Sequence, residues 1–297
     1  MPNKQFTGIL PALVTPVDQD GALLEHTARA LIDWQLSQGV QGFYVCGNSG
    51  EGPALPDETR RRVTELAVEQ TAGRGKIICH VGAADARGAL ALARHAHAAG
   101  CDAISSLPPT AYFDYSEDEI FEYYRALSES APLPLIVYAT AMFRQPDIAP
   151  FIGRLMELPN VIGVKFTRQN YYEMRNVIEL NGGDINVFNG PDETLVGGLL
   201  MGADAGIGTT YNVMPGRFAA LYGAFARGDF EAARQAQFGI NRVIRVLLRH
   251  GLISAVKQTL RELGFDMGEP IWPRRGFTPE EAKALRREME EAGFRYQ

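Results

Sequence analysis

One lysine of this chain stands inside an apolar segment, where a charged side chain is unusual. The segment reads Val-Ile-Gly-Val-Lys-Phe, and its lysine is Lys165. Burial disfavours the charged ammonium and favours the neutral amine, which is a nucleophile able to form a Schiff base with a ketone. The structural alternative is a lysine whose alkyl stem lies along apolar neighbours while its ammonium reaches water. Taken alone, Lys165 leaves both interpretations open.

A tyrosine and a glycine-rich turn supply two further chemical groups. Tyr138 lies in Leu-Ile-Val-Tyr-Ala-Thr, where its phenol could carry protons to and from an amine or fill the core. Residues 47–52 read Gly-Asn-Ser-Gly-Glu-Gly, and their backbone N–H groups and Ser49 hydroxyl suit a carboxylate. The turn has neither a Walker ending nor a dinucleotide fingerprint, and an ordinary strand-to-helix connection would also use such glycines.

The elements that must position these residues follow a regular pattern. Up to about residue 210, short β-rich segments alternate with longer segments that carry apolar residues at helical spacing. The predicted strands are Ile9–Thr15, Gly42–Cys46, Lys76–Val81, Asp102–Ser106, Leu135–Thr140, Val161–Phe166, Ile185–Asn189 and Ala205–Thr209. The predicted crossover helices include Glu25–Ser37, Asp57–Gln70, Arg87–Ala99, Glu117–Leu127 and Asp147–Leu158. Eight such units favour an α/β fold, a closed (β/α)8 TIM barrel, over a doubly wound sheet.

After Gly228 the β pattern stops and helical patterns take over. An apolar stripe that ends at Gly251 is formed by Ile240, Val243, Ile244 and Leu247. Two capping boxes that predict helix starts are Ser116 with Glu119 and Thr278 with Glu281. We therefore expect a barrel domain over residues 1–228 and a C-terminal helical appendage over residues 229–297.

Charge and composition favour a small molecule as the ligand. The net charge of −6 gives no general attraction to nucleic acid or to an anionic membrane. No apolar run is long enough to predict a spanning helix, and the first residues do not have the pattern of a secretion signal. Cys46, Cys79 and Cys101 lie in or beside apolar runs, without metal-type spacing. We expect reduced thiols and a cytoplasmic protein.

We expect no metal site in this protein. His95 and His97 lie two residues apart on a predicted helix, so their side chains point in different directions. No His-Glu-x-x-His or Cys-x-x-Cys pattern occurs, and the carboxylates lack the spacing of a calcium loop.

In a (β/α)8 barrel the active site lies at the carboxyl ends of the strands, and several polar residues follow predicted strands. Besides Lys165 and Tyr138, the candidates at these ends are Thr167, Gly190, Asp192, Glu193 and Thr209. The carboxylate pair suits vicinal hydroxyl groups as a double acceptor, and acids near a helix N-terminus are the structural alternative.

Together these residues resemble the dihydrodipicolinate synthase and N-acetylneuraminate lyase superfamily, and its lyase branch in particular. The resemblance covers nearly the whole chain, on four ordered motifs: GNSGEG, LIVYAT, GVKFT and GADAGIGTTYNVMPG. It implies that Lys165 forms the Schiff base and that Tyr138 is the proton shuttle. It also implies that Ser49 assists catalysis and binds the substrate carboxylate, in a binding loop with Asn48 and Gly50.

The resemblance implies reversible cleavage of N-acetylneuraminate to N-acetylmannosamine and pyruvate by a class I aldolase without a cofactor. It implies a homotetramer in which a neighbouring subunit lends Tyr112 to the site. The residues that match the positions holding the polyhydroxyl tail in sialic acid lyases are Thr167, Gly190, Asp192, Glu193 and Thr209. The alternatives are another pyruvate-dependent aldolase or dehydratase acting on a sugar acid, then dihydrodipicolinate synthase, then a noncatalytic barrel that senses a keto acid.

The chain departs from the family pattern in the loops. The family's proline three residues after the strand-five tyrosine is absent, because Ala141 stands there. Arg144 lies one residue later than the arginine with which synthases bind a second substrate. The loop around Tyr112 is one residue longer than in typical lyases. The missing proline would follow the strand that is expected to set specificity for the aldehyde.

Overall fold

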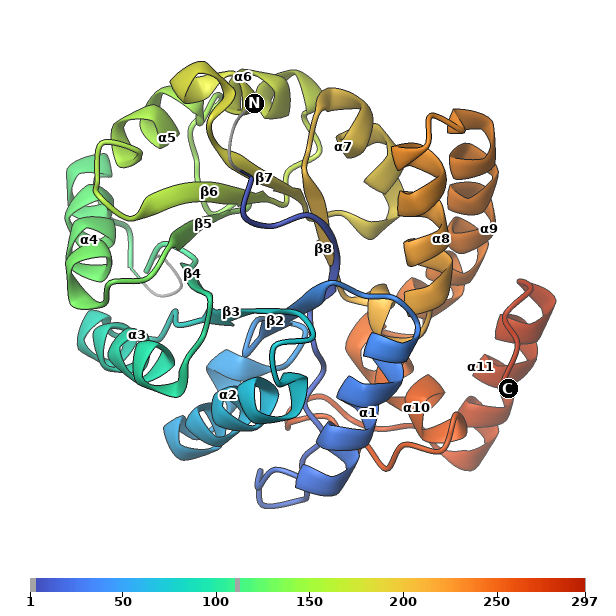
Figure 1. Ribbon diagram of the computed structural model, residues 1–297. Coiled ribbons are helices and arrows are strands. Elements are labelled where there is room, and N and C mark those ends of the chain that lie inside the picture. The colour runs from blue at the N-terminus through green and yellow to red at the C-terminus, as the bar shows by residue number, and fades with distance from the viewer. Residues whose placement is uncertain (1–3, 110–112, 297) are drawn as a thin grey trace.

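The computed structural model describes residues 4–109 and 113–296 of this chain. Eight parallel strands form one sheet that curls around a central axis (Figure 1). The strands are β1 (Gly8–Pro11), β2 (Gly42–Val45), β3 (Lys76–His80), β4 (Ala103–Ser106), β5 (Leu135–Ala139), β6 (Val161–Phe166), β7 (Asn186–Asn189) and β8 (Ala205–Gly208). The (β/α)8 TIM barrel prediction is confirmed.

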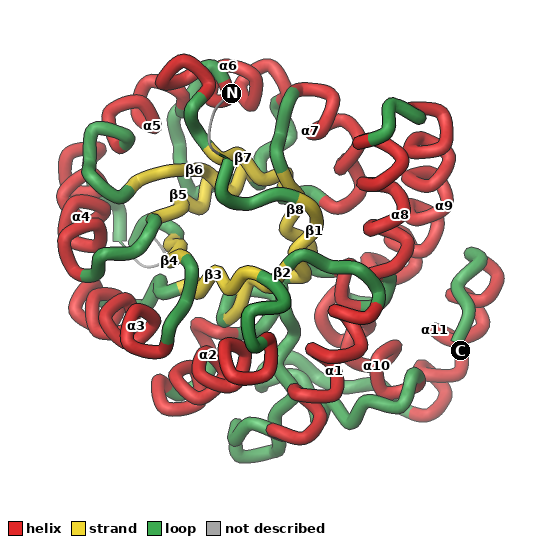
Figure 2. The backbone as a smooth tube through the Cα atoms, viewed as in Figure 1, coloured by secondary structure: helices red, strands yellow, loops and turns green. Residues whose placement is uncertain are grey.

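Helices connect consecutive strands and surround the sheet (Figure 2). They are α1 (Glu25–Ser37), α2 (Asp57–Thr71), α3 (Ala86–Ala99), α4 (Glu117–Ser130), α5 (Ala149–Leu155), α6 (Tyr171–Ile178), α7 (Leu195–Met201) and α8 (Pro215–Ala226). The predicted bounds of α5, Asp147–Leu158, were wrong at both ends. The Ile148 N–H donates to the Glu173 side chain, and the Asp147 carboxylate accepts from the Ala149 N–H, so the helix begins after both residues.

Seven strands lie within one residue of their predicted bounds at each end, and the first does not. β1 ends at Pro11, whereas the sequence predicted Thr15. Beyond the strand, the Val14 N–H donates to the Asn212 side chain, 3.2 Å away, and not to a neighbouring strand. The apolar residues that follow Pro11 therefore belong to the connection between β1 and α1.

The barrel closes where β1 meets β2, and this seam is short. Ala12 forms a single parallel bridge with Tyr44. Two backbone bonds flank it, from Leu13 N to Tyr44 O at 2.9 Å and from Gln41 N to Ile9 O at 3.0 Å. The Gln41 side chain completes the seam by accepting from the Ile9 N–H at 2.7 Å. A side-chain amide thus takes part in closing the barrel.

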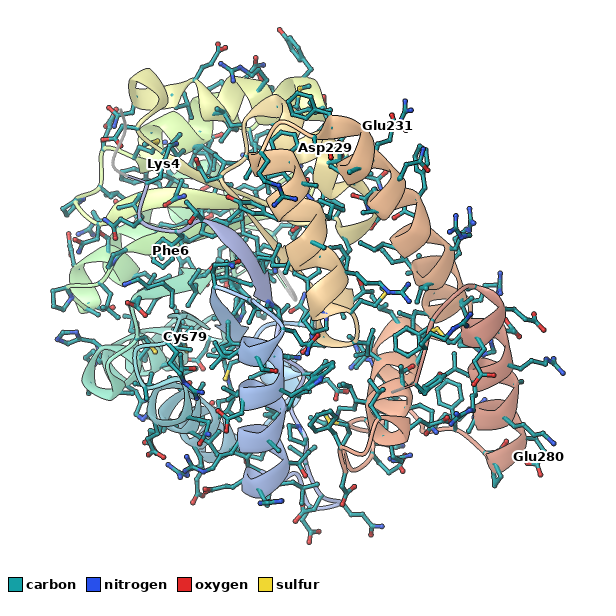
Figure 3. The ribbon with its side chains drawn as sticks, turned by 45° about the vertical axis from the view of Figure 1, so that its right-hand side comes forward. Lys4, Phe6, Cys79, Asp229, Glu231 and Glu280 are labelled. Carbon is teal, nitrogen blue, oxygen red and sulfur yellow. The ribbon has the colours of Figure 1, made fainter. Side chains whose placement is uncertain are left out.

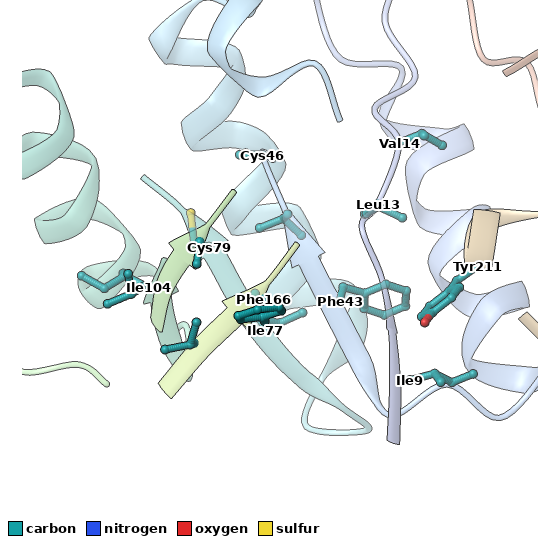
Figure 4. Close-up of a cluster of buried hydrophobic side chains, with 14 of the residues drawn as sticks. Ile9, Leu13, Val14, Phe43, Cys46, Ile77, Cys79, Ile104, Phe166 and Tyr211 are labelled. Carbon is teal, nitrogen blue, oxygen red and sulfur yellow. The ribbon is translucent and has the colours of Figure 1, made fainter. Parts of the chain in front are cut away.

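Alternation along the strands decides which side chains face the barrel axis. Tyr44 and Tyr138 belong to an inner cluster with residues such as Ile136 and Phe188. Their neighbours along the strands belong to the outer cluster between sheet and helices, which includes Phe43, Cys79, Ile104 and Phe166 (Figure 4). Because side chains alternate across a strand, Lys165 lies on the inner face of β6 while Phe166 lies on its outer face.

The last part of the chain forms three helices outside the barrel. They are α9 (Phe230–Arg249), α10 (Leu252–Glu262) and α11 (Pro279–Glu291). Asp229 caps the N-terminus of α9, because its carboxylate accepts a hydrogen bond from the Ala232 N–H. α9 lies beside α8 (Figure 3). Both predicted capping boxes are confirmed at the starts of α4 and α11. No helix in the described part of the chain is both long and apolar enough to cross a membrane.

Candidate active site

Lys165 lies at the bottom of the barrel mouth, between two tyrosine rings. Its side chain is only 5% exposed. The amine nitrogen is 4.0 Å from the centre of the Tyr138 ring and 4.2 Å from the centre of the Tyr44 ring. The strand register places Tyr138 directly opposite Lys165 on the neighbouring strand. No described carboxylate forms an ion pair with this ammonium, so the rings are its close neighbours.

Two more side chains complete the wall behind Lys165. The Tyr44 hydroxyl donates to the Ser105 hydroxyl at 3.1 Å, which in turn donates to the Ile136 carbonyl at 2.8 Å. The buried His80 ring stands perpendicular to the Tyr138 ring, with 6.0 Å between centroids. Burial is the main cause that lowers the pKa of His80 to about 3, and the positive charges of Arg60 and Lys165 lower it further. This imidazole is therefore neutral near pH 7.

The loop at residues 47–52 presents backbone N–H groups at the same end of the barrel. No described residue accepts a hydrogen bond from the N–H of Ser49 or Gly50. The Gly50 carbonyl accepts from the Thr15 hydroxyl at 2.7 Å, which turns this peptide in a fixed direction. The Ser49 and Thr209 hydroxyls are 2.6 Å apart, whereas Asn48 is exposed. Thr209, which was predicted to bind the polyhydroxyl tail, therefore contacts the loop that was predicted to bind the substrate carboxylate.

Glu51 anchors this loop to the C-terminal part of the chain. Its carboxylate is buried and lies 2.7 Å from the Lys257 ammonium on α10. It also accepts from the Ile271 N–H at 3.0 Å and pairs with Arg274 at 3.2 Å. Burial lowers the pKa of Lys257, and the Glu51 carboxylate opposes that shift. A loop that follows β2 is thus fixed by residues more than 200 positions later in the chain.

Asp192 is buried beneath the rim beside the end of β8. One of its oxygens accepts from both the N–H and the hydroxyl of Thr210, each at 2.6 Å. Burial raises the pKa of Asp192 to about 6, against the opposing effect of the Thr210 hydrogen bonds. The carboxylate is therefore ionised near pH 7 and able to accept hydrogen bonds from further hydroxyl groups.

Helix α9 holds the backbone of the Asp192–Glu193 segment from outside the barrel. The Gln237 side chain donates to the Asp192 carbonyl at 3.1 Å, and the Asn241 side chain donates to the Glu193 carbonyl at 2.9 Å. These bonds occupy the carbonyls and leave the two carboxylates to other partners. The helical appendage thus takes part in positioning the rim.

Thr167 and Gly190 lie against each other at the ends of β6 and β7. The Gly190 N–H donates to the Phe166 carbonyl at 2.9 Å. A Cβ atom at position 190 would lie 1.9 Å from the Thr167 hydroxyl oxygen, so only glycine lets the two strand ends approach this closely. The Thr167 hydroxyl is buried and has no hydrogen-bond partner among the described residues.

Arg168 holds the loop that lacks the family's proline. Its guanidinium donates to the carbonyls of Phe143 at 2.7 Å and Gln145 at 3.0 Å, and it pairs with the buried Glu173 at 2.7 Å. Arg144, by contrast, is 75% exposed and pairs with Asp114 at the surface. Arg168 and Glu173 therefore fix this loop, while the Arg144 side chain takes part in an exposed ion pair.

Tyr112, the residue expected to come from a neighbouring subunit, lies outside the described residues. His95, one of the two histidines considered as metal ligands, contacts Glu65 at 2.9 Å. Within residues 4–109 and 113–296, no group of three His, Cys, Asp or Glu side chains is arranged to hold a metal ion.

The sequence and the architecture both match a known family. The sequence model of the dihydrodipicolinate synthetase family matches residues 5–292. The chain belongs to this family. It is 36% identical over 282 residues to the N-acetylneuraminate lyase of Rhizobium meliloti (strain 1021), covering 95% of this chain and 94% of that protein.

Solved structures agree with the sequence comparison. The Proteus mirabilis N-acetylneuraminate lyase has a TM-score of 0.92 at 30% identity and covers 99% of this chain and 100% of its own. A catalytic lysine mutant of the Ruminococcus gnavus sialic acid aldolase has a TM-score of 0.91 at 27% identity and covers 99% of each chain.

Several residues of the site were not found by sequence reasoning. Tyr44 and His80 occupy inward positions on β2 and β3, as Tyr138 does on β5. The signal that would have found them is the two-residue alternation along a strand, applied to all eight strands. Lys257 and Arg168 gave no such signal, because their partners Glu51 and the loop carbonyls are distant in the sequence or belong to the backbone.

We expect the buried ion pair of Lys257 to carry substantial stability. Lys257→Met leaves the Glu51 carboxylate buried without its principal partner, which typically costs about 3–5 kcal/mol in free energy of unfolding. Urea denaturation measures this loss. The matched control is Lys76→Met, which removes an exposed pair with Asp102 and should cost less than about 1 kcal/mol. Equal losses in the two variants would contradict a structural role for the buried pair.

The raised pKa of Asp192 predicts a pH-dependent difference in stability from Asp192→Asn. Because the folded-state pKa is about 6 and the ordinary value is 3.8, the folded protein binds this proton more tightly. That stabilisation is complete below the ordinary value and is lost as the pH rises to about 6. Relative to the variant, the unmodified protein should therefore lose about 1–3 kcal/mol of unfolding free energy across this window. A constant difference would show that Asp192 titrates as an exposed acid.

Proposed function

We propose that this protein is a class I aldolase that reversibly cleaves N-acetylneuraminate to N-acetylmannosamine and pyruvate, with Lys165 as the Schiff-base amine. The observation that carries the proposal is that the buried Lys165 lies between two aromatic rings at the barrel mouth, in a chain of this family. The lyases and the aldolase that it resembles are named for this substrate, and one of them is described as having a catalytic lysine.

The reaction begins with attack of the neutral Lys165 amine on the ketone carbon of the open-chain sugar acid. Loss of water gives an iminium at C2, which accepts the electrons of the C3–C4 bond as that bond breaks. Tyr138 receives the proton of the C4 hydroxyl, and N-acetylmannosamine leaves. The remaining enamine is protonated at carbon and hydrolysed to pyruvate, which frees the amine. Lysine supplies the electron sink, so the proposed reaction needs no organic cofactor.

The two ends of the substrate meet different parts of the rim. The free N–H groups of Ser49 and Gly50, with the Ser49 hydroxyl, suit the carboxylate of the keto acid. The buried Asp192 carboxylate, Glu193 and the unpartnered Thr167 hydroxyl suit the hydroxyl groups of the tail. Thr209, next to Ser49, and Thr210, next to Asp192, are consecutive residues that connect the two ends.

A second candidate is a pyruvate-dependent aldolase or dehydratase that acts on another sugar acid. The observation that favours it is the Phe143–Gln145 loop, which Arg168 holds in place of the family's proline. The two candidates share the lysine chemistry and differ in the aldehyde. Synthesis assays with pyruvate and a panel of aldehydes distinguish them, because N-acetylmannosamine should give the highest kcat/KM if the first proposal holds.

We also propose a cytoplasmic homotetramer. The three free buried thiols support a reducing compartment. In the tetramer, Tyr112 would enter the site of a neighbouring subunit and extend the proton path of Tyr138. Sedimentation velocity measures this assembly.

We expect borohydride to trap pyruvate on Lys165. The chain has five lysines, and the other four are Lys4, Lys76, Lys257 and Lys283. Reduction in the presence of pyruvate or N-acetylneuraminate should add one pyruvyl group to the peptide with Lys165, as read by peptide mass mapping. Lys165→Arg is the control and should remain unlabelled. Labelling of another lysine, or none, would exclude the Schiff-base mechanism.

The Tyr138 hydroxyl should be required for proton transfer. Tyr138→Phe keeps the ring against Lys165 and removes only the hydroxyl, so kcat for N-acetylneuraminate cleavage should fall roughly 10²–10⁴-fold. A continuous assay of pyruvate release measures it. Tyr124→Phe removes a buried hydroxyl that donates to the Ser106 carbonyl and should leave kcat nearly unchanged. Near-normal turnover of the Tyr138 variant would show that this tyrosine only packs in the core.

A further inference from the structure

The nitrogen of Lys165 faces two aromatic rings, and no described carboxylate pairs with it. The Tyr44 and Tyr138 rings are nearly perpendicular, at 77°, with 6.0 Å between centroids. The amine nitrogen lies within cation–π distance of both. The amine therefore occupies the corner between two π-faces, inside the barrel and out of bulk water.

This environment matters because the proposed reaction changes the charge on that nitrogen. The neutral amine attacks the ketone carbon and forms the carbon–nitrogen bond. One proton then passes from the nitrogen to the former carbonyl oxygen, and the Tyr138 hydroxyl donates a second. The oxygen leaves as water with the electron pair of its bond to carbon, so the nitrogen carries the positive charge of the iminium. A carboxylate at contact distance would hold the lysine as an ammonium before attack. A π-face attracts a cation more weakly and has no lone pair with which to keep the proton.

We propose that Tyr44 is a catalytic residue whose ring face stabilises the iminium formed on Lys165. This inference rests on the proposed Schiff-base chemistry. It assigns Tyr44 a role for its ring and not for its hydroxyl, because the hydroxyl is 3.1 Å from the Ser105 hydroxyl and is engaged within the barrel. Tyr138 supplies the second face and, by its hydroxyl, the proton path.

The structure holds the Tyr44 ring from three sides. Its backbone carries the bridge that closes the barrel. A Cβ atom at position 47 would lie 2.6 Å from a ring carbon of Tyr44, so Gly47 lets the carboxylate-binding loop pass directly over the ring edge. The uncharged His80 ring stands 6.1 Å away on the third side. A neutral imidazole there fills the space without repelling the cation.

The experiment measures the pyruvate concentration that gives half-maximal borohydride trapping on Lys165. Tyr44→Phe keeps the π-face and should change this concentration less than about threefold. Tyr44→Leu removes the face and should raise it roughly 5–30-fold, as expected for a desolvated cation–π contact. Tyr124→Leu, which removes a buried tyrosine without contact to Lys165, is the matched control and should leave it unchanged.

Fluorinated phenylalanines incorporated at position 44 provide a test that does not depend on Tyr44→Leu folding. Each added fluorine withdraws charge from the ring face and nearly preserves its shape, so the half-saturating pyruvate concentration should rise stepwise with fluorine number. A flat series, or an equal effect of Tyr44→Leu and Tyr124→Leu, would overturn the role of the ring while leaving the Schiff base intact. Absence of any adduct in the unmodified protein would instead overturn the proposed function itself.

Discussion

The seam between β1 and β2 is the constraint on which the site depends. A sheet of parallel strands gathers its strand ends into one mouth only if its two edges meet. Here they meet through one bridge, between Ala12 and Tyr44, and through the Gln41 side chain. The residue that carries the bridge is also a wall of the lysine site. Closure of the barrel and placement of the Tyr44 ring beside Lys165 are therefore one structural event.

The polar groups of the rim are held mainly by partners outside the strands that carry them. α10 and the segment after it bind the carboxylate of Glu51, while α9 binds the carbonyls of Asp192 and Glu193. These contacts use the Glu51 carboxylate and the Asp192 and Glu193 carbonyls, and leave the N–H groups of Ser49 and Gly50 without a partner among the described residues. The C-terminal helices thus contribute to the site without supplying a group that touches the proposed substrate.

Strand and helix patterns predicted the barrel because periodicity is a local property. Lys165 and Tyr138 were found for the same reason, since a polar residue at the end of an apolar strand is visible in a short window of sequence. The contact of Ser49 with Thr209, the burial of Glu51 against Lys257 and the clamp of Arg168 were not predicted. Each joins residues whose pairing depends on how loops cross the rim, and residue type alone does not encode that path.

Glu51 also sets an order of events during synthesis of the chain. The loop proposed to bind the keto-acid carboxylate leaves the ribosome early, but Lys257, Ile271 and Arg274 follow more than 200 residues later. Until these residues are synthesised, the Glu51 carboxylate lacks the partners that compensate for its burial, and the loop lacks this anchor. A nascent chain with all eight strands already outside the ribosome therefore lacks the contacts that anchor Glu51. The anchoring of this loop is therefore completed only at the end of translation, when the last helices dock.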